Sequence, residues 1–282
     1  MRIQSIQQIA PMPFSLMGVQ QWPMLQYLVS YMAPKAHKIC IILVIAVAFN
    51  QLASWSLGGN LCFGAESSEL LRYEVTWNGN KAGHGDITTR KGSDQINVVA
   101  QAVSDEPLKK LLEIWSRVQA TFSSKKFQPK TYQFVLKSNL LRQEMVDLLF
   151  DHENNVVQIK KQSGEERESK SEKAKGLYDP VTAVFLLRSQ RDLRKPLFVD
   201  IFDGKDKARL YVSPAGEESI RTKAGFYKAL CLHLKLVKLG GDKKELATGK
   251  LWISDDPHRL PLLLTSSPIL GTIRFELVHA QL

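Results

Sequence analysis

Alternation of apolar and polar residues is the feature that most constrains how this chain folds. It is strict at residues 71–77 (LRYEVTW), and further strand-like runs lie at residues 81–90, 95–103, 115–122, 131–137, 143–150, 155–160, 197–202, 208–212, 227–239, 248–253, 260–264 and 272–278. Successive side chains of a strand point to opposite faces, so each run predicts a strand with one buried face. Short strands separated by turn residues such as Asn78-Gly79 are typical of antiparallel β-proteins. We expect a mainly β domain, a curved antiparallel sheet or half-barrel of about a dozen strands.

Two short helices are expected to interrupt these strands. The sequence LKKLLE follows Asp105-Glu106-Pro107, and VTAVFLLR follows Asp179-Pro180. Asp at the N-cap and Pro at the first helical position both favour a helix start. The second helix is apolar on nearly every side, so we expect it to pack against the concave face of the sheet. Its candidate ligand-binding residues are Val181, Val184, Phe185 and Leu187.

The segment between the helices is strongly charged. Residues 160–175 (KKQSGEERESKSEKAK) include one apolar side chain, that of Ala174. Such a composition contributes little to a core, so it predicts a flexible loop. The alternative is an electrostatic arm that contacts a partner.

The first 65 residues predict an exported protein. They contain Arg2, Lys35 and Lys38 but no Asp or Glu, and residues 39–49 (ICIILVIAVAF) form an apolar run that precedes a small-residue region ending at Ala65. This order is typical of a cleaved signal peptide, and the run is shorter than the roughly 20 residues that span a bilayer. A signal peptide normally has only a short basic region before its apolar run. We therefore interpret residues 1–31 as lying upstream of the true start of the protein, which we place at Met32. The alternatives are a genuine irregular extension and an uncleaved membrane anchor.

Residues 66–282 are expected to form a single β-rich domain in the periplasm or cell envelope. They carry 35 Lys and Arg against 28 Asp and Glu, and these charges are interleaved. No ladder of aromatic residues accompanies them, so we expect no nucleic-acid partner. Membrane contact is expected only through the leader or surface charge. One cysteine, Cys231, remains after cleavage, which excludes an internal disulfide.

The clearest cluster of chemically active side chains lies at residues 254–259 (SDDPHR). Two carboxylates, an imidazole and a guanidinium could bind a metal or perform acid–base chemistry. The segment also lies between two expected strands, where Asp and Pro favour a turn. We expect the turn.

Nothing else in the sequence predicts catalysis. The histidines are scattered without metal-ligand spacing, and Cys231 lies in an apolar strand where a thiol is buried and inert. No GxSxG motif positions a serine nucleophile. We therefore expect no enzyme activity, no catalytic residue, no metal and no cofactor.

Three C-terminal segments carry a family resemblance. They are LYVSPAGEESIRTKAGFYKA (210–229), GKLWISDDPHRLPL (249–262) and GTIRFEL (271–277), and LRYEVTWNGNKAG (71–83) and the helix after Asp179 fit the same pattern. Together they resemble the bacterial exported family called domain of unknown function 3108. Its fingerprint residues in this chain are Trp252, Asp255, Asp256, Arg259, Pro261 and Gly271, to which we assign backbone roles in turn capping, strand entry and tight bending.

The resemblance implies an envelope protein with a half-barrel similar to lipoprotein carriers of the LolA type, and it supplies no activity. From the apolar helix and this implied fold we expect a binding module for an apolar or lipid-like ligand. The alternative is a structural or accessory envelope protein that binds other proteins through sheet edges or the charged segment.

Overall fold

The computed structural model describes residues 67–241, 243–266 and 271–282. The predicted signal peptide, the over-long start and the alternative membrane anchor all concern residues outside these ranges. The described strands are β1 (Ser67–Trp77), β2 (Asn80–Lys91), β3 (Gln95–Ser104), β4 (Ile114–Ser123), β5 (Pro129–Ser138), β6 (Glu144–Asp151), β7 (Val156–Ser163), β8 (Glu166–Lys173), β9 (Leu197–Phe202), β10 (Lys207–Thr222), β11 (Gly225–Lys238), β12 (Glu245–Ser254), β13 (Pro261–Ser266) and β14 (Ile273–Gln281). The described helices are α3 (Leu108–Leu111) and α4 (Pro180–Arg188).

Within these residues the strands form one antiparallel sheet of fourteen strands, in the order β8-β7-β6-β5-β4-β3-β2-β1-β14-β13-β12-β11-β10-β9. All strands that are consecutive in sequence pair with each other except β8 and β9, and the first and last strands, β1 and β14, also pair. The described sheet stays open, with β8 and β9 at its edges. The predicted fold class is confirmed, and each alternating run corresponds to a strand.

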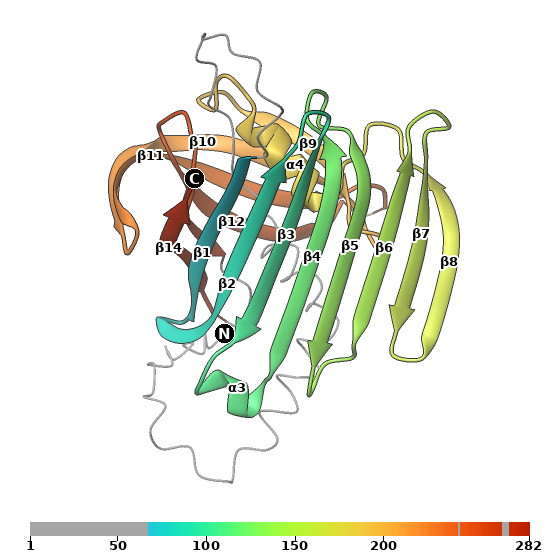
Figure 1. Cartoon of the computed structure of the whole chain (residues 1–282), viewed down its shortest axis with the longest axis horizontal. Helices are drawn as coiled ribbons and strands as arrows, with labels where there is room; N and C mark the ends of the chain where they lie inside the picture. Colours follow the sequence, from blue (N-terminus) through green and yellow to red (C-terminus); the bar gives the residue numbers. More distant parts are fainter. Residues whose placement is uncertain (1–66, 242, 267–270) are drawn as a thin grey trace, which may run out of the picture.

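The sheet curls so that its two halves face each other. Figure 1 shows β10, β11 and β12 crossing behind the strands β2 to β5. The turn between β9 and β10 reaches the concave side of β6, where a Cβ on Gly204 would lie 2.4 Å from a methyl carbon of Val146. Lys205 Nζ lies 2.7 Å from Glu144 Oε2 at the same place. Contacts across the interior therefore join the two halves into one core.

Alternation explains which side chains fill this core. On β11, Leu230, Leu232, Leu234 and Leu236 are buried. The same period-two burial runs through β2 to β7, because one face of every strand turns toward the interior. The convex face is mostly polar or half-buried.

The charged segment is a hairpin, so the predicted flexible loop at residues 160–175 is wrong. β7 continues to Ser163, the chain turns at Gly164, and β8 pairs with β7 along its whole length. Lys170 Nζ lies 3.1 Å from Glu168 Oε1 and 3.2 Å from Glu172 Oε1. Backbone pairing and charge pairs stabilise this strand without a buried face, which is why the apolar alternation gave no sign of it.

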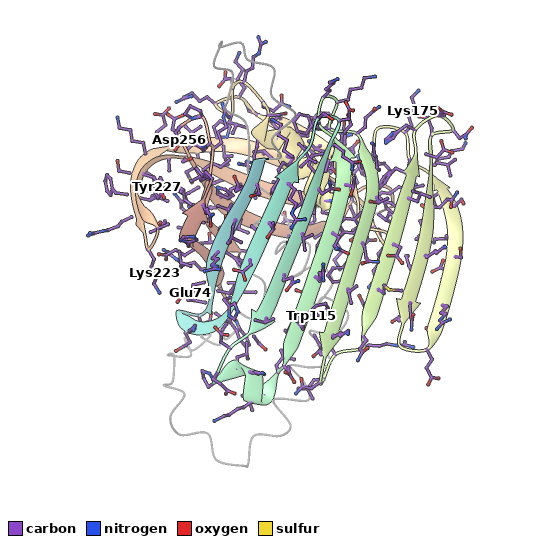
Figure 2. The ribbon with its side chains drawn as sticks, in the orientation of Figure 1. Glu74, Trp115, Lys175, Lys223, Tyr227 and Asp256 are labelled. Atoms are coloured by element: carbon purple, nitrogen blue, oxygen red, sulfur yellow. The ribbon has the colours of Figure 1, made fainter. Side chains whose placement is uncertain are left out.

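The β10–β11 hairpin extends beyond its neighbours, and Figure 1 shows it curving down to the left of β14. A bulge between Pro214 and Gly216 bends β10. Near the tip, Lys223 Nζ lies 2.7 Å from Glu74 Oε1 on β1 (both residues are labelled in Figure 2). Cys231, on β11, is buried, and this burial raises the pKa of its thiol.

Candidate functional site: the interior and its helical plug

Helix α4 begins where the sequence predicts, because Asp179 caps it and Pro180 occupies the first turn. Asp179 Oδ1 accepts a hydrogen bond of 2.9 Å from the backbone N–H of Thr182, and Asp179 Oδ2 also accepts one from the Thr182 hydroxyl. Burial raises the pKa of the Asp179 carboxyl to about 6, and the hydrogen bonds from Thr182 oppose that shift. The helix is therefore fixed at its start by a carboxyl group inside the protein.

The four candidate ligand-binding residues of α4 are all inside the protein. Val181, Val184, Phe185 and Leu187 are at most 2% exposed. The ring of Phe185 lies 5.1 Å from that of Phe122 on β4, in a tilted arrangement that favours aromatic contact. At this end of the interior, protein side chains occupy the space that the sheet encloses.

The end of α4 is tied to the sheet by a buried polar cluster. Arg188, the last helical residue, is 2% exposed, and its Nη2 donates a hydrogen bond of 2.9 Å to the carbonyl of His258. Burial lowers the pKa of the Arg188 guanidinium, and the negative charge of Glu69 on β1 opposes this shift. Tyr73, also on β1, donates a hydrogen bond of 2.9 Å to the carbonyl of Pro261. Burial raises the pKa of the Tyr73 hydroxyl, with a smaller contribution from Glu69.

Glu69, Tyr73 and Arg188 were not among the residues singled out from the sequence. The available signal was the position of Glu69 two residues before Leu71, on the buried face of an alternating strand. A charged residue at such a position needs a partner inside the protein. Arg188 follows the apolar run of α4 and has the opposite charge.

The segment at residues 254–259 forms a turn whose side chains contact the residues that follow α4. Asp256 Oδ1 accepts hydrogen bonds from the backbone N–H groups of His258 (2.8 Å) and Arg259 (2.9 Å). Arg259 has a φ of 48° and donates through Nη2 to the carbonyl of Arg191 at 2.9 Å. Asp255 instead pairs with Arg194, with 2.9 Å between Oδ2 and Nη2. The side chains of this segment thus make backbone hydrogen bonds and ion pairs within the protein.

The other fingerprint residues also lie in structural contacts. Trp252 on β12 donates from its ring N–H to the Glu218 carboxylate on the β10–β11 hairpin. Gly271 has a φ of 123°, and a Cβ there would lie 2.1 Å from Asn78 Oδ1. A side chain at this position would be strained by the backbone and would meet a turn residue.

A small hollow lies on the inner side of the strands β10 to β13. Its volume is about 20 Å³, which is enough for about one water molecule. Its surface is almost wholly apolar and is lined by Leu210, Leu234, Leu236, Ala247, Thr248, Gly249 and Leu264.

A further group of charged side chains lies around Asp105. His84 Nδ1 lies 2.8 Å from Asp105 Oδ1, and Lys81 Nζ lies 3.0 Å from the other oxygen of the same carboxylate. Among the described residues, no three His, Cys, Asp or Glu side chains gather as a metal would require. No helix in that part of the chain is long and apolar enough to cross a membrane.

The solved structures that resemble this chain share little sequence with it. A β-barrel-like protein of domain of unknown function DUF1849 from Brucella abortus is 12% identical, with a TM-score of 0.49, and the match covers 76% of this chain and 97% of that one. A protein from Bacteroides fragilis described as exported, with a YmcC-like fold, is 10% identical at a TM-score of 0.34, covering 76% and 95%. A protein from Parabacteroides distasonis described as a lipoprotein is 11% identical at a TM-score of 0.32, covering 77% and 96%.

Comparison with sequences gives a definite family and no characterised relative. No curated protein matches the chain. The profile of the family "Protein of unknown function (DUF3108)" matches residues 72–278, which is nearly the whole β-domain and well over half of the chain. The protein therefore belongs to the DUF3108 family.

Proposed function

We propose that this protein is an exported binding protein of the cell envelope that takes up an apolar chain, of lipid or acyl type, in the hollow between β10 and β13. The observation that carries the proposal is the chemistry of that hollow. Four leucines, Leu210, Leu234, Leu236 and Leu264, line a partly open space with almost no polar surface. Apolar lining of this kind favours an apolar ligand, because each buried methylene group contributes about 0.8 kcal/mol.

The size of the hollow limits what it holds in this conformation. The hollow has room for about one water molecule, so an acyl chain enters it only when neighbouring side chains move apart. The packing of Phe185 and its neighbours argues against a ligand at the α4 end while the helix is in place.

The leader supports an envelope location for this activity. Its basic residues, apolar run and small-residue region follow the order of a signal peptide, and export would bring the β-domain next to membrane lipids.

The alternative proposal, an accessory protein that binds partners through sheet edges, has less support. The edge strand β8 carries Glu166, Glu168, Lys170, Glu172 and Lys173. Charged edge strands oppose the addition of another strand, because each added strand would have to bury or pair these charges. The other edge strand, β9, is bridged by Tyr178, whose N–H donates to Asp200 and whose carbonyl accepts from Phe202.

Binding of a fluorescent fatty acid to the exported protein tests the proposal. Ala247 lines the hollow and is half-buried, so Ala247→Phe places a ring in the ligand space. Ala280→Phe is the matched control, because Ala280 is also a half-buried alanine beside the core but does not line the hollow.

We expect saturable binding that Ala247→Phe weakens at least about tenfold, which is about 1.4 kcal/mol, and that Ala280→Phe leaves unchanged. Native mass spectrometry of the protein from its own envelope should show a bound lipid in the unmodified protein. Absence of saturable binding, or equal loss in both variants, would reject a ligand site in this hollow. A stoichiometric protein partner in place of lipid would favour the alternative.

A further inference from the structure

A separate feature lies at the end of the sheet that carries α3, where two neighbouring loops each expose a leucine. Leu111, at the end of α3, is 42% exposed, and Leu140, between β5 and β6, is 40% exposed. Each is followed directly by a buried leucine, Leu112 or Leu141. Each loop therefore uses one leucine of a pair for the core and presents the other to the surroundings.

Hydrogen bonds hold the two loops side by side. The N–H of Glu113 donates to Asn139 Oδ1 at 2.9 Å, and the N–H of Asn139 donates to the Glu113 carbonyl at 3.3 Å. Ser138 Oγ accepts from the N–H groups of Leu140 (3.3 Å) and Leu141 (3.2 Å), which fixes the second loop. These hydrogen bonds fix the backbone of the loops that carry the exposed leucines.

Lysines and a tryptophan belong to the elements that carry or adjoin these two loops. Lys137 Nζ lies 5.3 Å from the centre of the Trp115 ring, and Figure 2 labels Trp115 close to the end of the sheet where Figure 1 shows α3. Lys109 and Lys110 belong to α3 itself. The nearby acids are Glu106, Glu113, which lies 3.6 Å from Lys109, and Asp105, whose carboxylate pairs with Lys81 and His84. We call Lys109, Lys110, Leu111, Trp115, Lys137 and Leu140 the loop-end patch.

We propose that the loop-end patch docks the protein on a phospholipid bilayer that carries anionic headgroups. Leucines at loop tips can enter the acyl boundary, and tryptophan favours the headgroup level of a bilayer. Lysine is attracted to an anionic membrane surface and keeps its charge in water while its stem covers apolar surface. The combination fits a bilayer because exposed apolar groups and positive charges occur together at one end of the sheet. This inference goes beyond ligand uptake and does not depend on the hollow.

Vesicle co-sedimentation tests the docking surface. The exported protein is mixed with phosphatidylcholine vesicles that either contain or lack phosphatidylglycerol, at low and at high salt. The first variant is Leu111→Ser with Leu140→Ser, and the second is Lys110→Gln with Lys137→Gln. The matched control is Leu149→Ser, because Leu149 is 49% exposed but lies on β6, outside the patch.

We expect binding to the anionic vesicles that high salt weakens. The leucine variant should bind at least about tenfold more weakly. Each lysine removed should cost about fivefold on the anionic vesicles and little on the neutral ones. The control should bind like the unmodified protein, and melting temperatures should show that each variant is folded.

Two outcomes would overturn the proposal: no binding of the unmodified protein to anionic vesicles, or equal losses in the leucine variant and Leu149→Ser. If the leucine variant fails to fold, unchanged binding of the lysine variant would do the same. Loss of binding to a purified protein partner, with vesicle binding absent throughout, would assign the patch to a protein interface instead.

Discussion

Replacing Phe185 with alanine tests how completely the interior is filled at the α4 end. The Phe185 ring is 2% exposed, packs on Phe122 at 5.1 Å between ring centres, and lies 5.3 Å from the Arg188 guanidinium. Its removal would leave a cavity beside a helix that is fixed at both ends by buried polar groups. The surroundings therefore have little freedom to collapse into that cavity.

The expected loss of stability is large. Phenylalanine to alanine in a packed core costs about 3 to 5 kcal/mol, and limited collapse places Phe185 in the upper part of that range. A domain of this kind has a total free energy of unfolding of about 5 to 15 kcal/mol. The variant should fold at low temperature with a much reduced margin.

Urea unfolding followed by tryptophan fluorescence measures the effect. With a slope of about 2 kcal/mol/M, a loss of 4 kcal/mol moves the midpoint by about 2 M at an unchanged slope. Phe226→Ala is the control, since Phe226 is 71% exposed and its removal should change the midpoint little. A loss below about 1 kcal/mol for Phe185→Ala would refute the packed interior and would place the ring against ligand space.

Two further predictions concern buried or capping carboxylates. Asp256→Ala should lower the free energy of unfolding by about 0.5 to 2 kcal/mol, because two backbone N–H groups lose their acceptor. Asp255→Ala removes only an exposed ion pair and should cost less than about 1 kcal/mol. Thermal unfolding of both variants checks this difference, and equal losses would contradict it. Folding raises the pKa of Asp179 from 3.8 to about 6, so the folded protein binds this proton more tightly than the unfolded chain does. The free energy of unfolding should therefore fall by about 3 kcal/mol as pH rises from about 4 to 6, and then level off. Asp179→Asn keeps a capping oxygen and should flatten that part of the stability profile in urea unfolding at several pH values, and an unchanged profile would exclude Asp179 as its source.

Local patterns in the sequence predicted most of the sheet because burial on one face leaves a period of two. Residues 71–77 and 227–239 show it clearly, and β1 and β11 lie there. The Asp179-Pro180 pair predicted the start of α4 for a similar reason, since capping depends on neighbours in sequence. β8 lacks a buried face, so its pairing with β7 left no apolar pattern to detect.

Features that depend on distant residues could not be obtained in this way. Glu69, Tyr73 and Arg188 meet only because the chain returns α4 to the inner face of β1, more than a hundred residues away in sequence. From the sequence, we expected both Asp255 and Asp256 to cap the turn. In the structure Asp256 caps the turn, and Asp255 pairs with Arg194, a residue whose position depends on the path after α4.

Photo-crosslinking with a fatty acid that carries a diazirine at the end of its chain tests ligand uptake in the hollow most directly. The exported protein is irradiated with this probe, digested, and the modified peptides are located by mass spectrometry. We predict adducts on the strands that line the hollow, at or beside Leu210, Leu234, Leu236 and Leu264, and competition by unlabelled fatty acid. Adducts confined to other strands, or labelling that unlabelled fatty acid does not reduce, would contradict the proposed function.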